Sequence, residues 1–221
     1  MKIDIAVSPS KIICVGRNYA EHAKELGNEI PSAPLLFLKA PSAIIAAGEA
    51  IVIPSQSDQV EHEGELGVFI GRDCKNIRDD ENPFQYVLGY TCVNDVTARD
   101  IQRADVQFTR GKSFDTFCPI GPHIETELDV SDLRLVTKVN GVIKQDGRTS
   151  QMVFPVDFLI RYISRQMTLK AGDLIATGTP SGVSKMTDGD VCEVTIEGIG
   201  TLTNPIKSST DAFVGRSPEL E

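Results

Sequence analysis

Apolar runs separated by short polar segments dominate the first hundred residues, a pattern that predicts buried strands with few helices. After a first apolar strand, residues 19–26 predict a helix of two turns. Asn18 is its expected N-cap, Glu21 completes a capping box, and Gly27 ends the helix in the left-handed conformation. The prolines of residues 28–34 prevent the helix from continuing, so a loop follows.

Carboxylates stand at the ends of two further apolar segments. Residues 61–70 begin with alternating glutamates and end in an apolar run typical of a buried strand. Residues 89–95 read as another buried strand, and Thr97 starts a capping pattern that predicts a helix over residues 97–107. Asp95 is therefore expected at a corner between a strand and a helix.

The second half of the chain predicts more sheet. Residues 133–139 alternate and lead into Asn140-Gly141, a strong signal for a two-residue hairpin turn. Apolar residues at helical spacing over residues 156–163 predict one amphipathic helix. From residue 172 onward short β-like segments return.

No regular alternation of strands and helices and no internal repeat occurs, which disfavours a doubly wound sheet or a TIM barrel. The predicted fold is mixed α/β and β-dominated, with few short helices in one domain over residues 1–207. Residues 208–221 lose periodicity and are expected to form a tail outside the core, partly of vector origin.

Composition narrows the class of protein. The chain has 221 residues, 41% hydrophobic and 24% charged, which is typical of an ordinary globular protein. A net charge of −9 without a cluster of Lys and Arg opposes binding to nucleic acid. Neither a signal peptide nor an apolar run of spanning length is visible, so we expect no membrane association.

Five cysteines are widely spaced and form no Cys-x-x-Cys pair, so they are interpreted as buried thiols in a reducing compartment. The expected location is cytoplasmic.

Glu63 and Glu65 are the most informative pair in the chain. Residues two apart in a strand project from the same face, so the two carboxylates stand side by side. One interpretation is a solvated strand without function; the other is a pocket in which a divalent cation supplies the counter-charge. Asp95 would complete an oxygen-only site suited to Mg²⁺ or Mn²⁺, although it could equally be a helix cap.

Three other positions could carry chemistry. His22 and Glu25 lie three residues apart on the first predicted helix, where the carboxylate could orient the imidazole as a general base. An exposed ion pair is the simpler alternative. Lys112 could reach a developing oxyanion or could be a solvated loop lysine, and residues 178–182 form a rigid turn that presents Thr179.

These segments together resemble the fumarylacetoacetate hydrolase family, in its single-domain acylpyruvase and oxaloacetate decarboxylase branch. The resemblance extends from about residue 11 to 206. Its motifs are Ile13-Cys14-Val15-Gly16-Arg17-Asn18-Tyr19-Ala20-Glu21-His22, His62-Glu63-Gly64-Glu65-Leu66-Gly67, Asp95-Val96-Thr97-Ala98-Arg99-Asp100-Ile101-Gln102, Gly111-Lys112-Ser113-Phe114-Asp115 and Thr177-Gly178-Thr179-Pro180-Ser181-Gly182-Val183.

The resemblance implies a β-roll fold, a homodimer and a lid over residues 18–34. It also implies Mg²⁺ or Mn²⁺ bound by Glu63, Glu65 and Asp95, with His22, Glu25 and Lys112 as the catalytic residues. The substrate contacts that it implies are Arg17, Tyr19, Arg99, Gln102 and Thr179.

The activity implied by the resemblance is hydrolysis of a carbon–carbon bond in a 2,4-dioxo acid (an acylpyruvate). Oxaloacetate decarboxylation and isomerisation of 2-hydroxyhepta-2,4-diene-1,7-dioate remain alternatives, because each needs the same chelation of a 2-oxo acid. A catalytically inactive protein that binds oxo acids is the alternative outside the enzymes.

Overall fold

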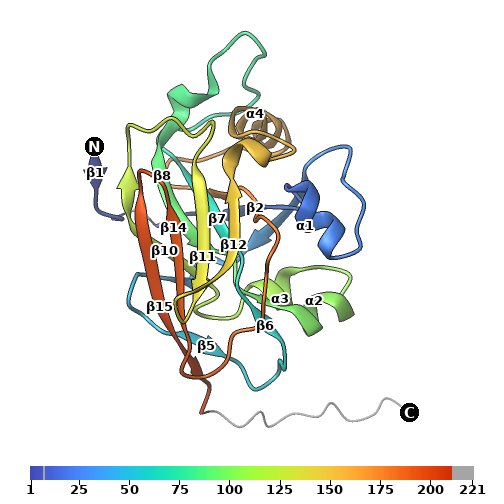
Figure 1. Ribbon diagram of the computed structural model, residues 1–221. Helices are drawn as coiled ribbons and strands as arrows, with labels where there is room; N and C mark the ends of the chain where they lie inside the picture. The colour runs from blue at the N-terminus through green and yellow to red at the C-terminus, as the bar shows by residue number, and fades with distance from the viewer. Residues whose placement is uncertain (7, 211–221) are drawn as a thin grey trace.

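The computed structural model describes residues 1–6 and 8–210, and two β-sheets dominate it (Figure 1). The larger sheet has eight strands in the order β1-β10-β8-β7-β13-β2-β3, with β4 paired to β10. The smaller sheet has five strands in the order β12-β11-β14-β15-β5, and β6 and β9 form a separate pair.

The strands of the large sheet are β1 (Lys2–Ile3), β2 (Ile12–Gly16), β3 (Leu35–Lys39), β4 (Ile44–Ile45), β7 (Gly64–Ile70), β8 (Val87–Asn94), β10 (Cys118–Glu125) and β13 (Leu174–Ala176). The other strands are β5 (Ile51–Ile53), β6 (Val60–Glu61), β9 (Thr97–Ala98), β11 (Arg134–Val139), β12 (Val142–Arg148), β14 (Val191–Ile196) and β15 (Gly200–Ser208). The α-helices are α1 (Ala20–Glu25), α2 (Arg99–Ala104), α3 (Thr109–Lys112) and α4 (Val156–Gln166), and the 3₁₀ turns are Pro41–Ala43, Pro83–Tyr86 and Thr149–Gln151. The predicted β-dominated mixed α/β class is confirmed.

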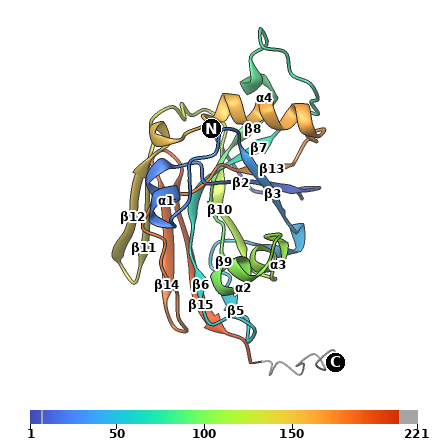
Figure 2. The ribbon, with the colours of Figure 1, turned by 90° about the vertical axis from the view of Figure 1, so that its right-hand side faces the viewer.

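The core lies on both faces of the large sheet. On β2, Ile13 and Val15 belong to a cluster that also contains residues of the small sheet and of α4. Ile12 and Cys14 point the other way, into a second cluster with Ile101 of α2. Because both faces of β2 are covered, its residues form a continuous apolar run instead of an alternating pattern. Figure 2 shows the small sheet on one side of this layer and α2 and α3 on the other.

Helix α4 and the hairpin of β11 and β12 confirm two sequence predictions. Val156, Leu159 and Ile163 are all buried against the first cluster, so the apolar stripe of α4 covers one end of the sheets. Asn140 and Gly141 have φ angles of 52° and 77°, the backbone that a two-residue turn of this handedness requires.

Both predicted capping patterns are wrong. Helix α1 begins at Ala20 with Tyr19 as N-cap, and no side chain caps it. Asn18 instead uses its side chain for tertiary hydrogen bonds, which are stronger constraints here than a local cap. The helix expected over residues 97–107 is also shorter, because Thr97 first pairs with Glu61 in the ladder of β6 and β9, and α2 ends at Ala104.

The expected C-terminal tail is only partly described. Ser208 is the last residue of β15, one residue inside the predicted tail, and Ser209 donates its N–H to the Ile53 carbonyl. Residues 211–221 lie outside the described residues. All five cysteines are free and buried, as the sequence predicted. No helix of the described ranges is long and apolar enough to cross a membrane.

Candidate metal and 2-oxo acid site

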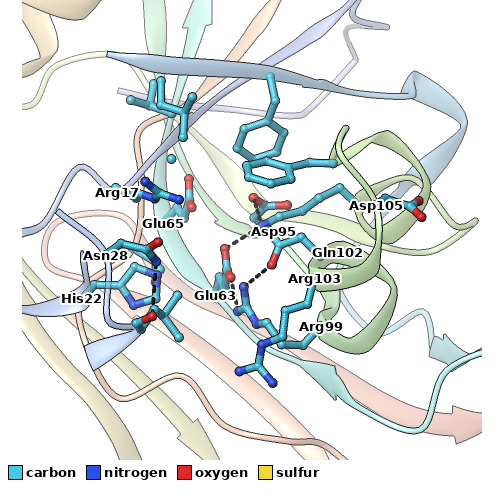
Figure 3. Close-up of a pocket in the computed structure, with 18 residues that line it drawn as sticks. Arg17, His22, Asn28, Glu63, Glu65, Asp95, Arg99, Gln102, Arg103 and Asp105 are labelled. Carbon is cyan, nitrogen blue, oxygen red and sulfur yellow. Dashed lines mark hydrogen bonds and ion pairs between the residues drawn. The ribbon is translucent and has the colours of Figure 1, made fainter. Parts of the chain in front are cut away.

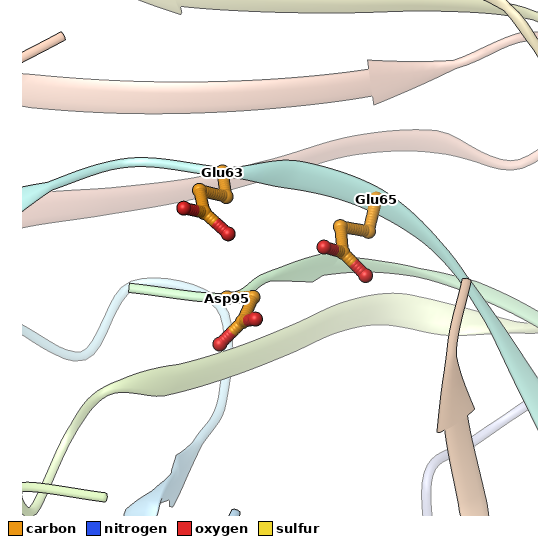
Figure 4. A group of neighbouring side chains, drawn as sticks. All are labelled: Glu63, Glu65 and Asp95. Atoms are coloured by element: carbon orange, nitrogen blue, oxygen red, sulfur yellow. The ribbon is translucent and has the colours of Figure 1, made fainter. Parts of the chain in front are cut away.

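Glu63, Glu65 and Asp95 converge at one point of the large sheet (Figure 4). One ligand atom from each carboxylate lies within 4.8 Å of the others, and all three residues are buried. Glu63 immediately precedes β7 and Glu65 is its second residue, so the two side chains, two residues apart in extended backbone, lie on the same face. Asp95 follows β8, and its N–H bonds to the Glu63 carbonyl at 2.8 Å, so the backbone of two adjacent strands fixes the three side chains.

Cations surround these carboxylates. Lys112 Nζ, at the end of α3, lies 2.7 Å from Glu63 Oε2 and 2.7 Å from Asp95 Oδ2. Arg99 donates to the other oxygen of Glu63 and, at 2.8 Å, to Glu61. Burial raises the pKa of Glu63, but Lys112 and Arg99 outweigh it and hold the pKa well below its ordinary value.

Lys39 is a site residue that the sequence reasoning missed. It is the last residue of β3, and its fully buried Nζ donates to Asp95 Oδ1 at 2.6 Å and to the Val96 carbonyl at 3.0 Å. Glu61 was missed as well, although it has the same strand parity as Glu63 and Glu65. A lysine that closes an apolar strand was the available signal for Lys39. We name these seven residues the buried charge cluster: Lys39, Glu61, Glu63, Glu65, Asp95, Arg99 and Lys112.

Glu65 is the carboxylate without a cation. Its described hydrogen-bond donor is the Gly178 N–H, at 2.8 Å. Burial, then repulsion from Asp95 and Glu63, raise the pKa of Glu65 well above its ordinary value. The cluster holds four carboxylates against three cations, so it lacks positive charge at the point where three oxygen ligands meet. A hard divalent cation such as Mg²⁺ or Mn²⁺ fits this donor set.

Lys112 is buried, so the alternative of a solvated loop lysine is wrong. Burial by itself lowers the pKa of Lys112, but Asp95 and Glu63 more than offset this and raise it. The ammonium therefore stays charged and acts as a fixed hydrogen-bond donor in the pocket.

His22 and Glu25 form the expected pair on α1. His22 Nδ1 lies 3.1 Å from Glu25 Oε2, and His22 is buried while the Glu25 side chain is a third exposed. The Glu25 carboxylate also accepts the Gly182 N–H at 3.0 and 3.2 Å. Glu25 thus orients the imidazole and docks α1 on the loop that carries Thr179. The alternative of an unimportant exposed ion pair does not fit a buried histidine that lines the pocket.

Asn18 anchors the segment between β2 and α1. Its amide donates to the Thr177 and Phe154 carbonyls at 2.7 and 3.0 Å and accepts the Phe154 N–H at 2.8 Å. Gly178 has a φ of 99°, and a Cβ there would come within 2.7 Å of Asn18 Cβ. The Asn18 side chain therefore packs directly against the backbone of Gly178, in the loop that carries Thr179.

A buried polar network positions Thr179. Gln145 of β12 donates to Thr179 Oγ1 and accepts the Gly64 N–H at 3.0 Å. Thr179 Oγ1 in turn donates to the Gly64 carbonyl at 2.8 Å. The small sheet thereby fixes the Thr179 loop to the strand that carries the glutamates.

Most of the predicted site residues line one cavity of about 330 Å³ (Figure 3). Predicted site residues that line it are Arg17, His22, Glu63, Glu65, Asp95, Arg99, Gln102, Lys112 and Thr179. Gln102 and Arg99 bond to each other at 2.6 Å, so Arg99 is held mainly by protein groups. Residues of the lining that the sequence reasoning missed include Asn28, Arg103 and Asp105.

Tyr19 is the predicted substrate contact that the structure places elsewhere. It is buried in the first core cluster and is absent from the lining of the cavity. Its hydroxyl has no hydrogen-bond partner among the described residues, and burial raises its pKa. Glu25 does not line the cavity either and acts through His22.

Comparison with known proteins connects this geometry to a family. The fumarylacetoacetate (FAA) hydrolase C-terminal family matches residues 11–207. A mitochondrial oxaloacetate decarboxylase from Dictyostelium discoideum is 48% identical over 198 residues, covering 86% of this chain and 90% of that protein. The oxaloacetate tautomerase YisK from Bacillus subtilis is 44% identical, covering 90% of this chain and 70% of that protein.

A solved structure gives the same result. The 5-carboxymethyl-2-hydroxymuconate delta-isomerase from Mycobacterium smegmatis superposes with a TM-score of 0.86 at 48% identity, covering 93% of this chain and 81% of that one. The family match spans nearly all of the described domain, and the relatives share the sequence at levels that imply common ancestry. The chain therefore belongs to the fumarylacetoacetate hydrolase family.

Proposed function

We propose that the protein is a divalent-metal-dependent hydrolase that cleaves a carbon–carbon bond in acylpyruvates. The observation that carries this proposal is that His22, 3.1 Å from Glu25, lines the same cavity as the three carboxylates. A positioned base next to a cation site is what the attack of water on a carbonyl requires.

Glu63, Glu65 and Asp95 would hold Mg²⁺ or Mn²⁺, and the ion would chelate the 2-oxo acid and withdraw electrons as a Lewis acid. His22, oriented by Glu25, takes a proton from water as the water oxygen adds to the distal carbonyl carbon. The carbon–carbon bond then breaks, and its electron pair passes to the pyruvate part as an enolate. Lys112, held charged, donates a hydrogen bond to the enolate oxygen, and the proton that His22 took from water is delivered to the enolate carbon to give pyruvate.

Oxaloacetate is the second candidate substrate, for decarboxylation or tautomerisation. The relatives at 48% and 44% identity, named an oxaloacetate decarboxylase and an oxaloacetate tautomerase, favour it. Decarboxylation needs the electron withdrawal but no attacking water, so the His22–Glu25 pair would be dispensable for bond breaking. Isomerisation of unsaturated hydroxy-diacids, suggested by a Mycobacterium marinum neighbour at 46% identity named for 2-hydroxyhepta-2,4-diene-1,7-dioate, needs only proton transfer.

A protein that binds oxo acids without turnover is the remaining alternative. Such a protein would not need a base, a carboxylate that orients the base, and a buried ammonium close to one another. His22, Glu25 and Lys112 all occupy positions that suit catalysis, and this argues for an enzyme. We further propose a homodimer in the cytoplasm, for which the five free buried thiols suit a reducing compartment.

Proton NMR of acetylpyruvate and oxaloacetate, each with Mg²⁺, with Mn²⁺ and with chelator, tests the proposal. Metal-dependent formation of acetate and pyruvate from acetylpyruvate is the expected result. Turnover of oxaloacetate alone, above the rate with metal and no protein, would make the protein a decarboxylase instead. Solvent-deuterium exchange at C3 of oxaloacetate without loss of CO₂, above the protein-free rate, would indicate the tautomerase.

A further inference from the structure

Arg17 and Arg103 line the cavity with their charges unused. Among residues 1–6 and 8–210, neither guanidinium has an ion-pair or hydrogen-bond partner. Arg99, in the same cavity, contrasts with them because it bonds Glu61, Glu63 and Gln102. Two open guanidinium groups are notable in a chain whose net charge is −9.

Two acidic side chains at or next to this cavity, Asp105 and Glu25, already have hydrogen-bond partners of their own. Asp105, which lines the same cavity, is held by Arg110 through two hydrogen bonds of 2.8 and 2.6 Å. Glu25 is occupied by His22 and the Gly182 N–H. Within the described ranges, the Arg17 and Arg103 guanidinium groups therefore keep their N–H donors open to a ligand in the cavity.

The two arginines differ in position. Arg17 is half-buried between β2 and α1 and has a φ of 57°, a backbone conformation that is strained for a side chain of this size. Arg103 is exposed on α2, one turn beyond Arg99, and Figure 3 shows it on the α2 side of the cavity while Arg17 lies on the side of Glu65. Arg103 is therefore placed for the part of a ligand that extends away from the carboxylates.

We infer that Arg103 is a specificity-determining residue that binds a second carboxylate at the far end of the substrate. The planar guanidinium offers two parallel N–H groups to a carboxylate, a geometry that a neutral acyl group cannot use. Arg103 would thus favour 2-oxo diacids over 2-oxo acids with a neutral distal end. This inference rests on the proposed function only in that a 2-oxo acid occupies the cavity.

The test compares matched ligands on wild-type protein and Arg103→Gln. In turnover, kcat/KM for oxaloacetate is divided by that for acetylpyruvate. In binding, calorimetry with Mn²⁺ compares 2-oxoglutarate, a diacid, with 2-oxobutyrate, which has a neutral end. We expect Arg103→Gln to lower whichever preference ratio can be measured by about tenfold, and Arg103→Lys to retain part of it.

Two further variants sharpen the result. Arg165→Gln removes an exposed arginine of α4, far from the cavity, and should leave both ratios unchanged; a matching fall there would reduce the effect to net charge and overturn the inference. Arg110→Gln frees the Asp105 carboxylate beside Arg103, and a smaller fall in the ratios is expected because the new negative charge repels the diacid.

The outcomes separate the two proposals. A diacid preference in binding that Arg103→Gln abolishes, without any turnover, supports the role of Arg103 and rejects the hydrolase. If the protein turns over both substrates and Arg103→Gln lowers kcat/KM equally for each, the protein is an enzyme and the proposed role of Arg103 is wrong. Circular dichroism and thermal unfolding show that each variant is folded before these ratios are compared.

Discussion

The buried charge cluster and the two arginines Arg17 and Arg103 belong to one site but differ in whether their charges are paired within the protein. In the cluster, six of the seven charged groups have a partner of opposite charge, and they lie on β3, β6, α2 and α3 or directly beside β7 and β8. Only Glu65 lacks a cation there. Arg17 and Arg103 have no partner among the described residues.

This difference separates the two tasks of the site. Reaction chemistry needs carboxylates in fixed geometry, and a rigid pair of strands provides it. Recognition of a substrate needs charges whose partner is the substrate itself, because a charge already paired within the protein has little to gain from a ligand. Helix α1 brings His22 into the lining of the same cavity, close in sequence to Arg17.

Replacing Glu63 by glutamine is expected to have the largest effect. It removes one metal-ligand oxygen anion and leaves Lys112 and Arg99 in excess, so Mn²⁺ affinity and turnover should both fall on the order of 1,000-fold. Calorimetric titration with Mn²⁺ and the NMR assay measure the two quantities. Glu127→Gln, on an exposed glutamate, is the control. If Glu63→Gln changed neither quantity, the cluster would not be a metal site.

His22→Ala tests whether His22 is needed for hydrolysis but not for metal binding. We expect acylpyruvate hydrolysis to fall by about 100-fold to 10,000-fold while Mn²⁺ affinity stays within a few-fold, because His22 is not among the ligand carboxylates. Steady-state kinetics and metal titration of the same preparation check this. Robust hydrolysis by the variant would refute the assignment of His22 and Glu25, whereas retained oxaloacetate decarboxylation would not.

Lys39→Met measures how much the buried Lys39–Asp95 ion pair contributes to the free energy of unfolding. Removing this buried ammonium leaves Asp95 with less opposing charge, and we expect the free energy of unfolding to fall by about 3 to 5 kcal/mol. Urea unfolding without metal gives the value. Lys207→Met, on an exposed lysine of β15, should change it by less than about 0.5 kcal/mol. Equal effects of the two substitutions would show that pairing with Asp95 contributes nothing specific.

Substitution of Asp173, which lies outside the site, is expected to have the smallest effect, a change in stability that depends on pH. Burial raises its pKa, but hydrogen bonds from Lys11 and Ser10 outweigh burial and leave the pKa below its ordinary value. The resulting stability is present above the unfolded pKa of about 3.9 and is lost as the pH falls through the lower folded value.

Urea unfolding of the wild type and Asp173→Asn at pH 7 and at pH 3 tests this linkage. We expect the variant to be less stable by about 1 kcal/mol at pH 7 and the gap to narrow at pH 3. A gap that widens at low pH would give the opposite sign and contradict the lowered pKa.

The sequence predicted the parts of the site that depend on local spacing. The two-residue period of a strand puts Glu63 and Glu65 on one face, and the spacing of a helix puts His22 beside Glu25. Apolar spacing gave α4, and Asn140-Gly141 gave the hairpin turn. The order of five motifs identified the family, which the comparisons confirm.

Local reasoning failed where a tertiary partner competes for the same side chain. Asn18 is a residue type that often caps helices, but its side chain bonds the Thr177 and Phe154 carbonyls because the fold brings them close to it. Thr97 has helix-starting character but pairs with β6. Tyr19 belongs to a matching motif, yet it packs in the core and does not line the cavity.

The sequence by itself determined helix α4, the turn at Asn140-Gly141 and the proximity of Glu63 to Glu65 and of His22 to Glu25, because short-range geometry fixes them, and the order of its motifs determined the family. Only the tertiary structure decided that Lys39 and Glu61 complete the cluster, that Gln145 holds Thr179, and that Arg17 and Arg103 stay unpaired. Charge compensation depends on distances between residues far apart in the chain, and those distances exist only after the sheets have formed.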